Sequence, residues 1–110
     1  MEKLMTPRPR ITIPSHVPRP VRYDWLMAAA TLSGKSLHLA LALSWLAGLA
    51  HSPKVKLTRA TMRRFSLSRD ACYDGLRKME AARLVSVWRL PGRSPMVILL
   101  GPDEKPMTTW

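Results

Sequence analysis

Residues 57–95 read "LTRATMRRFSLSRDACYDGLRKMEAARLVSVWRLPGRSP", and this stretch decides the fold. Thr58 and Ser68 each stand directly before a helical segment, where a side-chain hydroxyl can cap the first turn by accepting a hydrogen bond from a backbone N–H group. In the second segment the apolar side chains from Cys72 to Met79 recur at helical spacing, so we expect them to face the core. The stretch therefore predicts two short helices joined by the tight connection "FSLS".

Two apolar runs follow the second helix and indicate a β-hairpin. They are "LVSVWRL" at 84–90 and "MVILL" at 96–100, and both are rich in β-branched or apolar residues. The connecting "PGRSP" contains the Pro and Gly that signal a turn, which puts Arg93 at the tip of the hairpin. Upstream of the two helices, "KVKL" at 54–57 alternates polar and apolar residues and predicts a very short strand.

Residues 37–50, "LHLALALSWLAGLA", predict a helix that is apolar almost all the way round. It is too short to cross a bilayer, which takes about 20 residues. A helix of this kind is normally buried or lies in an oligomer interface, and a domain this small can hardly surround it. We therefore expect a homodimer, although helix ends and tails could instead cover the helix. The side chains that share one face at i, i+4 spacing, and would form the interface, are Leu37, Leu41, Trp45 and Leu49.

The segment before this helix predicts a second, shorter helix. It reads "YDWLMAAATL" at 23–32, with Asp24 as its expected cap. The "SGKS" at 33–36 is reminiscent of a phosphate-binding loop, but that motif needs a glycine where this chain has Ala29. We interpret "SGKS" as a helix break and the N-cap of the following helix.

Three regions are expected along the chain. Residues 1–22 hold five prolines and several basic residues, which disfavour a helix or a central strand and predict an extended, basic arm. Residues 23–101 form one small domain that includes the dimerisation segment, because 110 residues suffice for one core. Residues 102–110 are left as a C-terminal tail.

The charge balance points to a polyanionic partner. The chain has 18 Lys and Arg against 7 Asp and Glu, a net charge of +11, and nucleic acid is the leading candidate. Cys72 has neither a second cysteine to pair with nor Cys or His neighbours at ligand spacing, which favours a reducing compartment and argues against a structural metal. The first residues lack the apolar run of a signal peptide, so we expect a cytoplasmic protein with no membrane contact.

An enzyme is not expected. His16, His38 and His51 lie in the arm, in the apolar helix and at its end. They form no Ser/His/Asp arrangement, no paired-carboxylate site and no metal-binding spacing. We therefore expect no catalytic residue, no cofactor and no metal.

The order of helix, short strand, helix, turn, helix and hairpin resembles the winged helix-turn-helix domain of bacterial transcription regulators. The resemblance covers roughly residues 37–100 and is carried by residues 57–95, with a Ser-capped second helix and a hydrophobic strand entering the wing. It implies a mainly α fold with a small β-hairpin, an α+β winged helix-turn-helix. Many relatives have glycine before the wing strand, where this chain has Arg83.

The resemblance also implies a recognition helix that presents its N-terminal residues to base edges in the major groove. The residues in this position, Arg69, Tyr73 and Arg77, are the expected base contacts. The charge pattern agrees, since Pro53 to Pro95 contains eleven Lys and Arg but only three acidic residues. The expected contacts to the DNA backbone are Lys54, Lys56, Arg59, Arg63, Arg64, Lys78, Arg89 and Arg93.

The sequence thus predicts sequence-specific binding of double-stranded DNA by a small bacterial or mobile-element transcription regulator. A plasmid replication or partition factor would look much the same. A second class stays open, because winged helices also bind proteins, and a basic one could bind or mask a nucleic-acid-binding partner. Asp70 and Asp74 on the recognition face keep this alternative open, since carboxylates near phosphates are repulsive.

Overall fold

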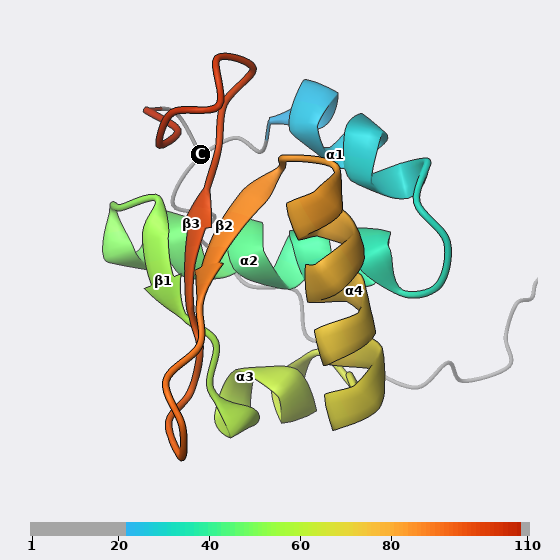
Figure 1. Ribbon diagram of the computed structural model, residues 1–110, viewed down its shortest axis with the longest axis vertical. Coiled ribbons are helices and arrows are strands. Elements are labelled where there is room, and N and C mark those ends of the chain that lie inside the picture. The colour runs from blue at the N-terminus through green and yellow to red at the C-terminus, as the bar shows by residue number, and fades with distance from the viewer. Residues whose placement is uncertain (1–21, 109–110) are drawn as a thin grey trace, which may run out of the picture.

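The computed structural model describes residues 22–108, so most of the arm expected at 1–22 lies outside the described residues. The described chain is an α+β domain of four helices and a three-stranded antiparallel sheet (Figure 1). The expectation of an α+β class is confirmed. The elements are α1 (Tyr23–Ala30), α2 (Ser36–Ala50), β1 (Lys54–Lys56), α3 (Arg59–Arg64), α4 (Arg69–Ala81), β2 (Val85–Trp88) and β3 (Met96–Leu99).

The sheet has the strand order β1-β3-β2, with β3 in the centre. The β2–β3 hairpin has the predicted location, and Val87 lies opposite Val97 in its register. Val55 of β1 is the partner of Val97 on the other side of β3, a pairing that the sequence pattern did not predict. Side chains alternate between the two faces of a strand, so these three valines point together into the core.

Helix α4 packs against α2 along one apolar side. Cys72, Leu76 and Met79 are fully buried, which confirms their predicted orientation. Gly75 is buried on the same side. A Cβ atom at Gly75 would lie 3.0 Å from Leu39 Cδ2 of α2, so the two helices approach closely at this point. Helix α4 is thereby held against the core by one side while its other side stays accessible.

The two hydroxyl caps predicted from the sequence are both confirmed. The Thr58 side chain accepts a hydrogen bond from the Thr61 backbone N–H at the start of α3. The Ser68 side chain accepts from the Ala71 N–H, at 3.1 Å, at the start of α4. Between the helices Ser66 has a φ of 54°, which turns the chain sharply. The caps and this turn fix where α4 begins relative to α3.

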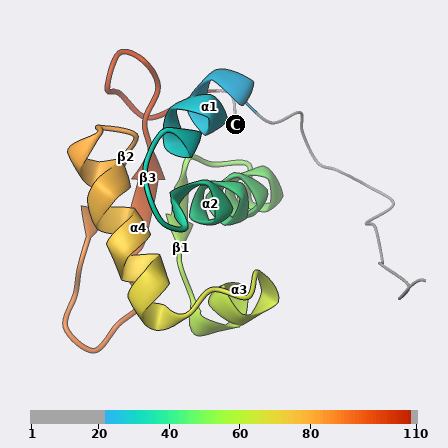
Figure 2. The same ribbon diagram turned by 90° about the vertical axis from the view of Figure 1, so that its right-hand side faces the viewer.

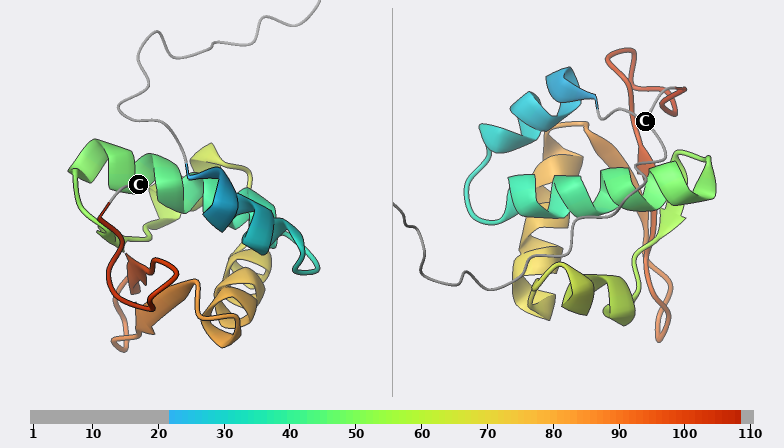
Figure 3. Two further views of the ribbon diagram at one scale, coloured as in Figure 1. Left: turned by 90° about the horizontal axis from the view of Figure 1, so that it is seen from above. Right: turned by 180° about the vertical axis from the view of Figure 1, so that it is seen from behind.

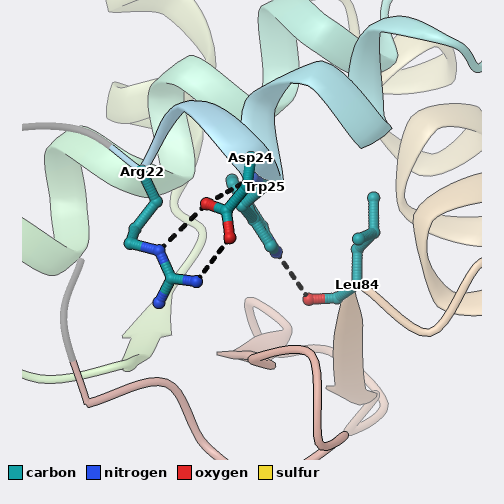
Figure 4. Close-up of polar contacts among 4 residues, drawn as sticks. All are labelled: Arg22, Asp24, Trp25 and Leu84. Carbon is teal, nitrogen blue, oxygen red and sulfur yellow. Dashed lines mark hydrogen bonds and ion pairs between the residues drawn. The ribbon is translucent and has the colours of Figure 1, made fainter.

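The start of α1 differs from the prediction, because Asp24 is not its cap. The N-cap position is Arg22, whose side chain makes no capping hydrogen bond. Asp24 lies in the first turn and forms a 2.6 Å ion pair with Arg22 (Figure 4). The hydrogen bond from Arg22 holds the pKa of Asp24 below its usual value. The adjacent indole of Trp25 donates to the Leu84 carbonyl oxygen at 3.1 Å and so ties α1 to the start of β2.

The segment between α1 and α2 breaks the helix as predicted, with Gly34 at a φ of 71°. The N-cap of α2 also falls within "SGKS", as predicted. Lys35 occupies the N-cap position without a side-chain capping bond, and the Ser36 hydroxyl instead donates to the Ser33 carbonyl oxygen. This hydrogen bond closes the turn from within α2 rather than from its cap.

Two further backbone features shape the top of the domain in Figure 1. Arg83, at the position that the family resemblance gives to glycine, adopts a left-handed φ of 62° and ends α4. Beyond β3 the chain turns back, and Met107 donates its N–H to the Leu99 carbonyl oxygen. The Met107 side chain is 3% exposed and belongs to the hydrophobic core.

Candidate functional site

One end of the domain brings together α3, the first turn of α4 and the tip of the β2–β3 hairpin (Figures 1 and 2). A groove of about 680 Å³ lies between these elements. A second groove, of about 580 Å³, lies between α4 and the hairpin. Arg69, Tyr73 and Arg93 line both grooves, so the two form one surface. We call this surface the α4–hairpin face.

Four arginines surround the first groove of the α4–hairpin face. Arg59 and Arg63 come from α3, Arg69 from the start of α4 and Arg93 from the hairpin tip. All four are exposed, and none has an ion-pair partner among residues 22–108. The Arg69 guanidinium stands over the Tyr73 ring at 5.6 Å from its centroid. This end of the molecule therefore carries concentrated positive charge that the described chain does not neutralise.

The cations of the second groove are partly neutralised. Asp74 pairs at 2.7 Å with Arg77 and Lys78, which follow it by three and four residues in α4; Arg77 lines the groove and Lys78 does not. The Lys78 ammonium is the main cause of the lowered pKa of Asp74. Glu80 pairs with Arg89 at 3.2 Å and links α4 to the hairpin. Arg77, Lys78 and Arg89 consequently have local partners, unlike the four arginines of the first groove.

Like Lys78, three other cations predicted for the site lie outside both grooves. Lys54 and Lys56 flank the buried Val55 on β1, so they project from the outer face of the sheet. Arg64 stacks on the Trp45 ring of α2, 4.8 Å from its centroid. The structure thus separates these residues from the cluster that the sequence alone suggested.

Helix α2 presents an apolar stripe on the domain surface. Leu37, Leu41 and Leu49 are 40%, 44% and 52% exposed. Trp45, in line with them, is half-buried and packs edge-on against Phe65, with ring centroids 5.5 Å apart. The four residues predicted to share a face do so. We call this set the α2 stripe.

Several other features bear on chemistry. Burial raises the pKa of the Cys72 thiol to about 11, so the thiol stays protonated near neutral pH. His38 Nε2 contacts the Phe65 carbonyl oxygen and links α2 to the α3–α4 turn. Within residues 22–108, no three His, Cys, Asp or Glu side chains gather as a metal site. The same span contains no helix long and apolar enough to cross a membrane.

Two sets of ion pairs in the site were not predicted from the sequence. The Glu80–Arg89 pair joins residues nine apart on different elements, which no local spacing indicates. The Asp74 pairs follow helical i+3 and i+4 spacing and could have been predicted from it.

No protein-family model matches the chain, and neither the curated proteins nor the solved structures contain a match. A proposal for the function therefore rests on the geometry of the chain itself.

Proposed function

We propose that the protein binds double-stranded DNA as a winged helix-turn-helix, with α3 and α4 as the helix-turn-helix and the β2–β3 hairpin as the wing. The observation that carries this proposal is the convergence of Arg59, Arg63, Arg69 and Arg93 at the end where α4 begins. The major groove of B-DNA is about 12 Å wide and admits an α-helix end-on or along its length. The capped N-terminus of α4 is the part of the domain that would enter it.

Arg69 and Tyr73 are the proposed base readers. They occupy the first and second turns of α4 on its accessible side, and a guanidinium can make two hydrogen bonds to guanine. Arg77 lies one turn further on and would have to exchange its Asp74 partner for a base, so we assign it a smaller role. Asp74 then serves to hold Arg77 and Lys78 rather than to oppose phosphates.

Arg59, Arg63 and Arg93 are the proposed phosphate contacts. Each phosphate neutralised by a cation lowers the slope of log affinity against log salt by about 0.9 for duplex DNA. These three contacts would give a slope of roughly −2.7 for each bound copy of the chain.

We further propose that two copies of the chain associate through the α2 stripe. Helix α2 carries no Lys, Arg, Asp or Glu, so it offers an uncharged contact to molecules that otherwise repel each other at +11. The exposed leucines of the stripe would be buried on association. A dimer would present two α4 helices to two half-sites, as expected of a transcription regulator in the cytoplasm.

The test begins by selecting bound duplexes from a random-sequence pool. Affinities for the selected duplex and for unrelated duplex are then measured by fluorescence anisotropy for wild type, Arg69→Ala and Tyr73→Ala. We expect each variant to lose about 5- to 150-fold on the selected duplex, the equivalent of 1 to 3 kcal/mol, and much less on unrelated duplex. Arg83→Ala is the matched control, because Arg83 pairs with Glu104 at the opposite end of the domain.

Equal losses on both duplexes would remove Arg69 and Tyr73 as base readers. A wild-type protein that binds no duplex at low salt would instead favour the competing class, a module that docks on another protein. Asp70 is the residue that this alternative explains best, since it is exposed at the α4 start and has no ion-pair partner in the described chain.

A further inference from the structure

The outer face of the sheet is a second surface with the chemistry of nucleic-acid binding. No described helix crosses this face, because α2 lies behind the sheet in Figure 1 and α4 lies beside it in Figure 3. Strand alternation places two lysines, one tryptophan and no carboxylate on it. Its side chains are Lys54 and Lys56 of β1, Met96 and Ile98 of β3, and Ser86 and Trp88 of β2.

Trp88 is the central observation. Its side chain is 56% exposed, whereas tryptophans of folded domains are on average highly buried. Trp88 lies opposite Met96, and Lys56 is the partner of Met96 on the other side. Neighbouring strands are about 4.8 Å apart, so Lys56 and Trp88 start from backbones roughly 10 Å apart. The sheet thus places Trp88 and Lys56 in one row on the same face, with Met96 between them.

Lys54 interacts with the Trp88 ring in the free protein. Its Nζ atom stands 5.4 Å from the ring centroid. An exposed cation–π contact is weaker than the stacking of a nucleic-acid base on an aromatic side chain. A base would therefore displace the flexible Lys54 side chain from the ring, and the freed ammonium could bind an adjacent phosphate. Lys54 and Lys56 have no ion-pair partner in the part of the chain that the structure describes.

We propose that this sheet face binds single-stranded nucleic acid, with an unpaired base stacked on Trp88 and the backbone phosphates held by Lys54 and Lys56. A single strand offers bases that can stack on the Trp88 ring and phosphates that can bind the two lysines. An acidic peptide would offer only the negative charge. The face is distinct from the α4–hairpin face, since Lys54, Lys56 and Trp88 line neither groove. The inference goes beyond duplex binding and does not depend on it.

The experiment titrates a fluorescein-labelled oligothymidylate of about 12 nucleotides, within the usual site size of a single-strand binding fold, against the full chain. Trp88→Ala should weaken this binding by about 5- to 150-fold, and Trp88→Phe, which keeps a ring, should retain most of it. The control is Leu90→Ala, which removes another exposed apolar side chain of the hairpin and should have little effect. Circular dichroism verifies that each variant is folded.

Measuring both the Arg69 and the Trp88 variant on duplex DNA and on oligothymidylate distinguishes the two surfaces. Arg69→Ala should weaken duplex binding and leave oligothymidylate binding intact, while Trp88→Ala should do the reverse. Lys54→Gln and Lys56→Gln should each flatten the salt dependence on the oligonucleotide by about 0.7. A Trp88→Ala variant that binds oligothymidylate like wild type, equal losses in Trp88→Phe and Trp88→Ala, or equal competition by polyglutamate would each overturn the proposal.

Discussion

Ser68 caps the end of α4 that is proposed to contact DNA. Two different substitutions of Ser68 are therefore expected to change the stability of the domain and its affinity for duplex DNA independently. The Ser68 hydroxyl accepts from the Ala71 N–H at 3.1 Å, and the residue is exposed. Ser68→Ala removes this acceptor without creating a cavity, which should cost about 1 kcal/mol of unfolding free energy. With a urea m-value of about 2 kcal/mol/M for a domain of this size, the unfolding midpoint should fall by roughly 0.5 M.

Ser68→Asp should preserve the stability of the domain but lower its affinity for duplex DNA. A carboxylate is as good an N-cap as a hydroxyl and interacts favourably with the positive end of the helix dipole, so stability should stay near wild type. The same carboxylate would lie next to Arg69, at the end of α4 that faces the phosphates. Two unit charges 4 Å apart in water interact by about 1 kcal/mol, so duplex affinity should fall about fivefold or more at low salt.

Urea denaturation followed by circular dichroism and duplex anisotropy are measured on both Ser68 variants. Thr108→Asp is the matched control, because it adds the same charge beside Arg22 and the 101–107 loop, outside both grooves of the α4–hairpin face. If Ser68→Ala leaves the midpoint unchanged, the capping contribution is wrong. If Ser68→Asp and Thr108→Asp bind duplex equally well, the start of α4 does not face DNA.

Three further predictions concern the core, the thiol and the α2 stripe. Leu76→Ala should cost 2 to 5 kcal/mol of unfolding free energy, since Leu76 is fully buried, and thermal denaturation measures this loss. Cys72 should react slowly with iodoacetamide in the native protein. Burial raises its pKa from 9.0 to about 11, so the stability present below pH 9 should fall by roughly 2 kcal/mol as pH rises from 9 to 11, in wild type but not in Cys72→Ala. Light scattering should find a wild-type dimer and a Leu41→Glu monomer; a monomeric wild type at tens of micromolar would exclude the interface.

The local parts of this fold could be predicted from the sequence. Caps, helical core positions and a Pro-Gly hairpin depend on residues within a few positions of each other, so Ser68, Leu76 and the β2–β3 turn followed from spacing and residue type. Asp24 was the exception. We predicted that the Asp24 carboxylate would cap α1, but it instead accepts a hydrogen bond from the Arg22 guanidinium, two residues earlier.

The non-local parts could not be predicted. The pairing of β1 with β3 joins residues 40 to 44 positions apart, and the three residues of "KVK" carry no signal of their partner. Met107 lies in a polar, Pro-containing segment that reads as a tail, yet a backbone hydrogen bond to Leu99 draws it into the core. Both outcomes depend on tertiary packing, which residue spacing alone does not record.

For the candidate site, the sequence identified the cationic residues but not the surface toward which each side chain points. Alternation about the buried Val55 sends Lys54 and Lys56 to the outer face of the sheet, away from the α4–hairpin face. On α3, Arg63 lines the first groove while its neighbour Arg64 turns to Trp45 of α2. Consecutive residues of a helix point about 100° apart, so the burial of Thr61 and Met62 in the core fixes which arginine of α3 lines the groove.

The most direct test of the proposed duplex contact is the salt dependence of binding by wild type, Arg93→Ala and Arg83→Ala on one duplex. Arg93 is exposed at the hairpin tip and has no ion-pair partner in residues 22–108, whereas Arg83 pairs with Glu104. We expect Arg93→Ala to weaken selected and unrelated duplex alike and to flatten the slope of log affinity against log salt by about 0.9. Arg83→Ala should keep the wild-type slope. An unchanged slope in Arg93→Ala would place the hairpin off the DNA and contradict the winged helix-turn-helix assignment.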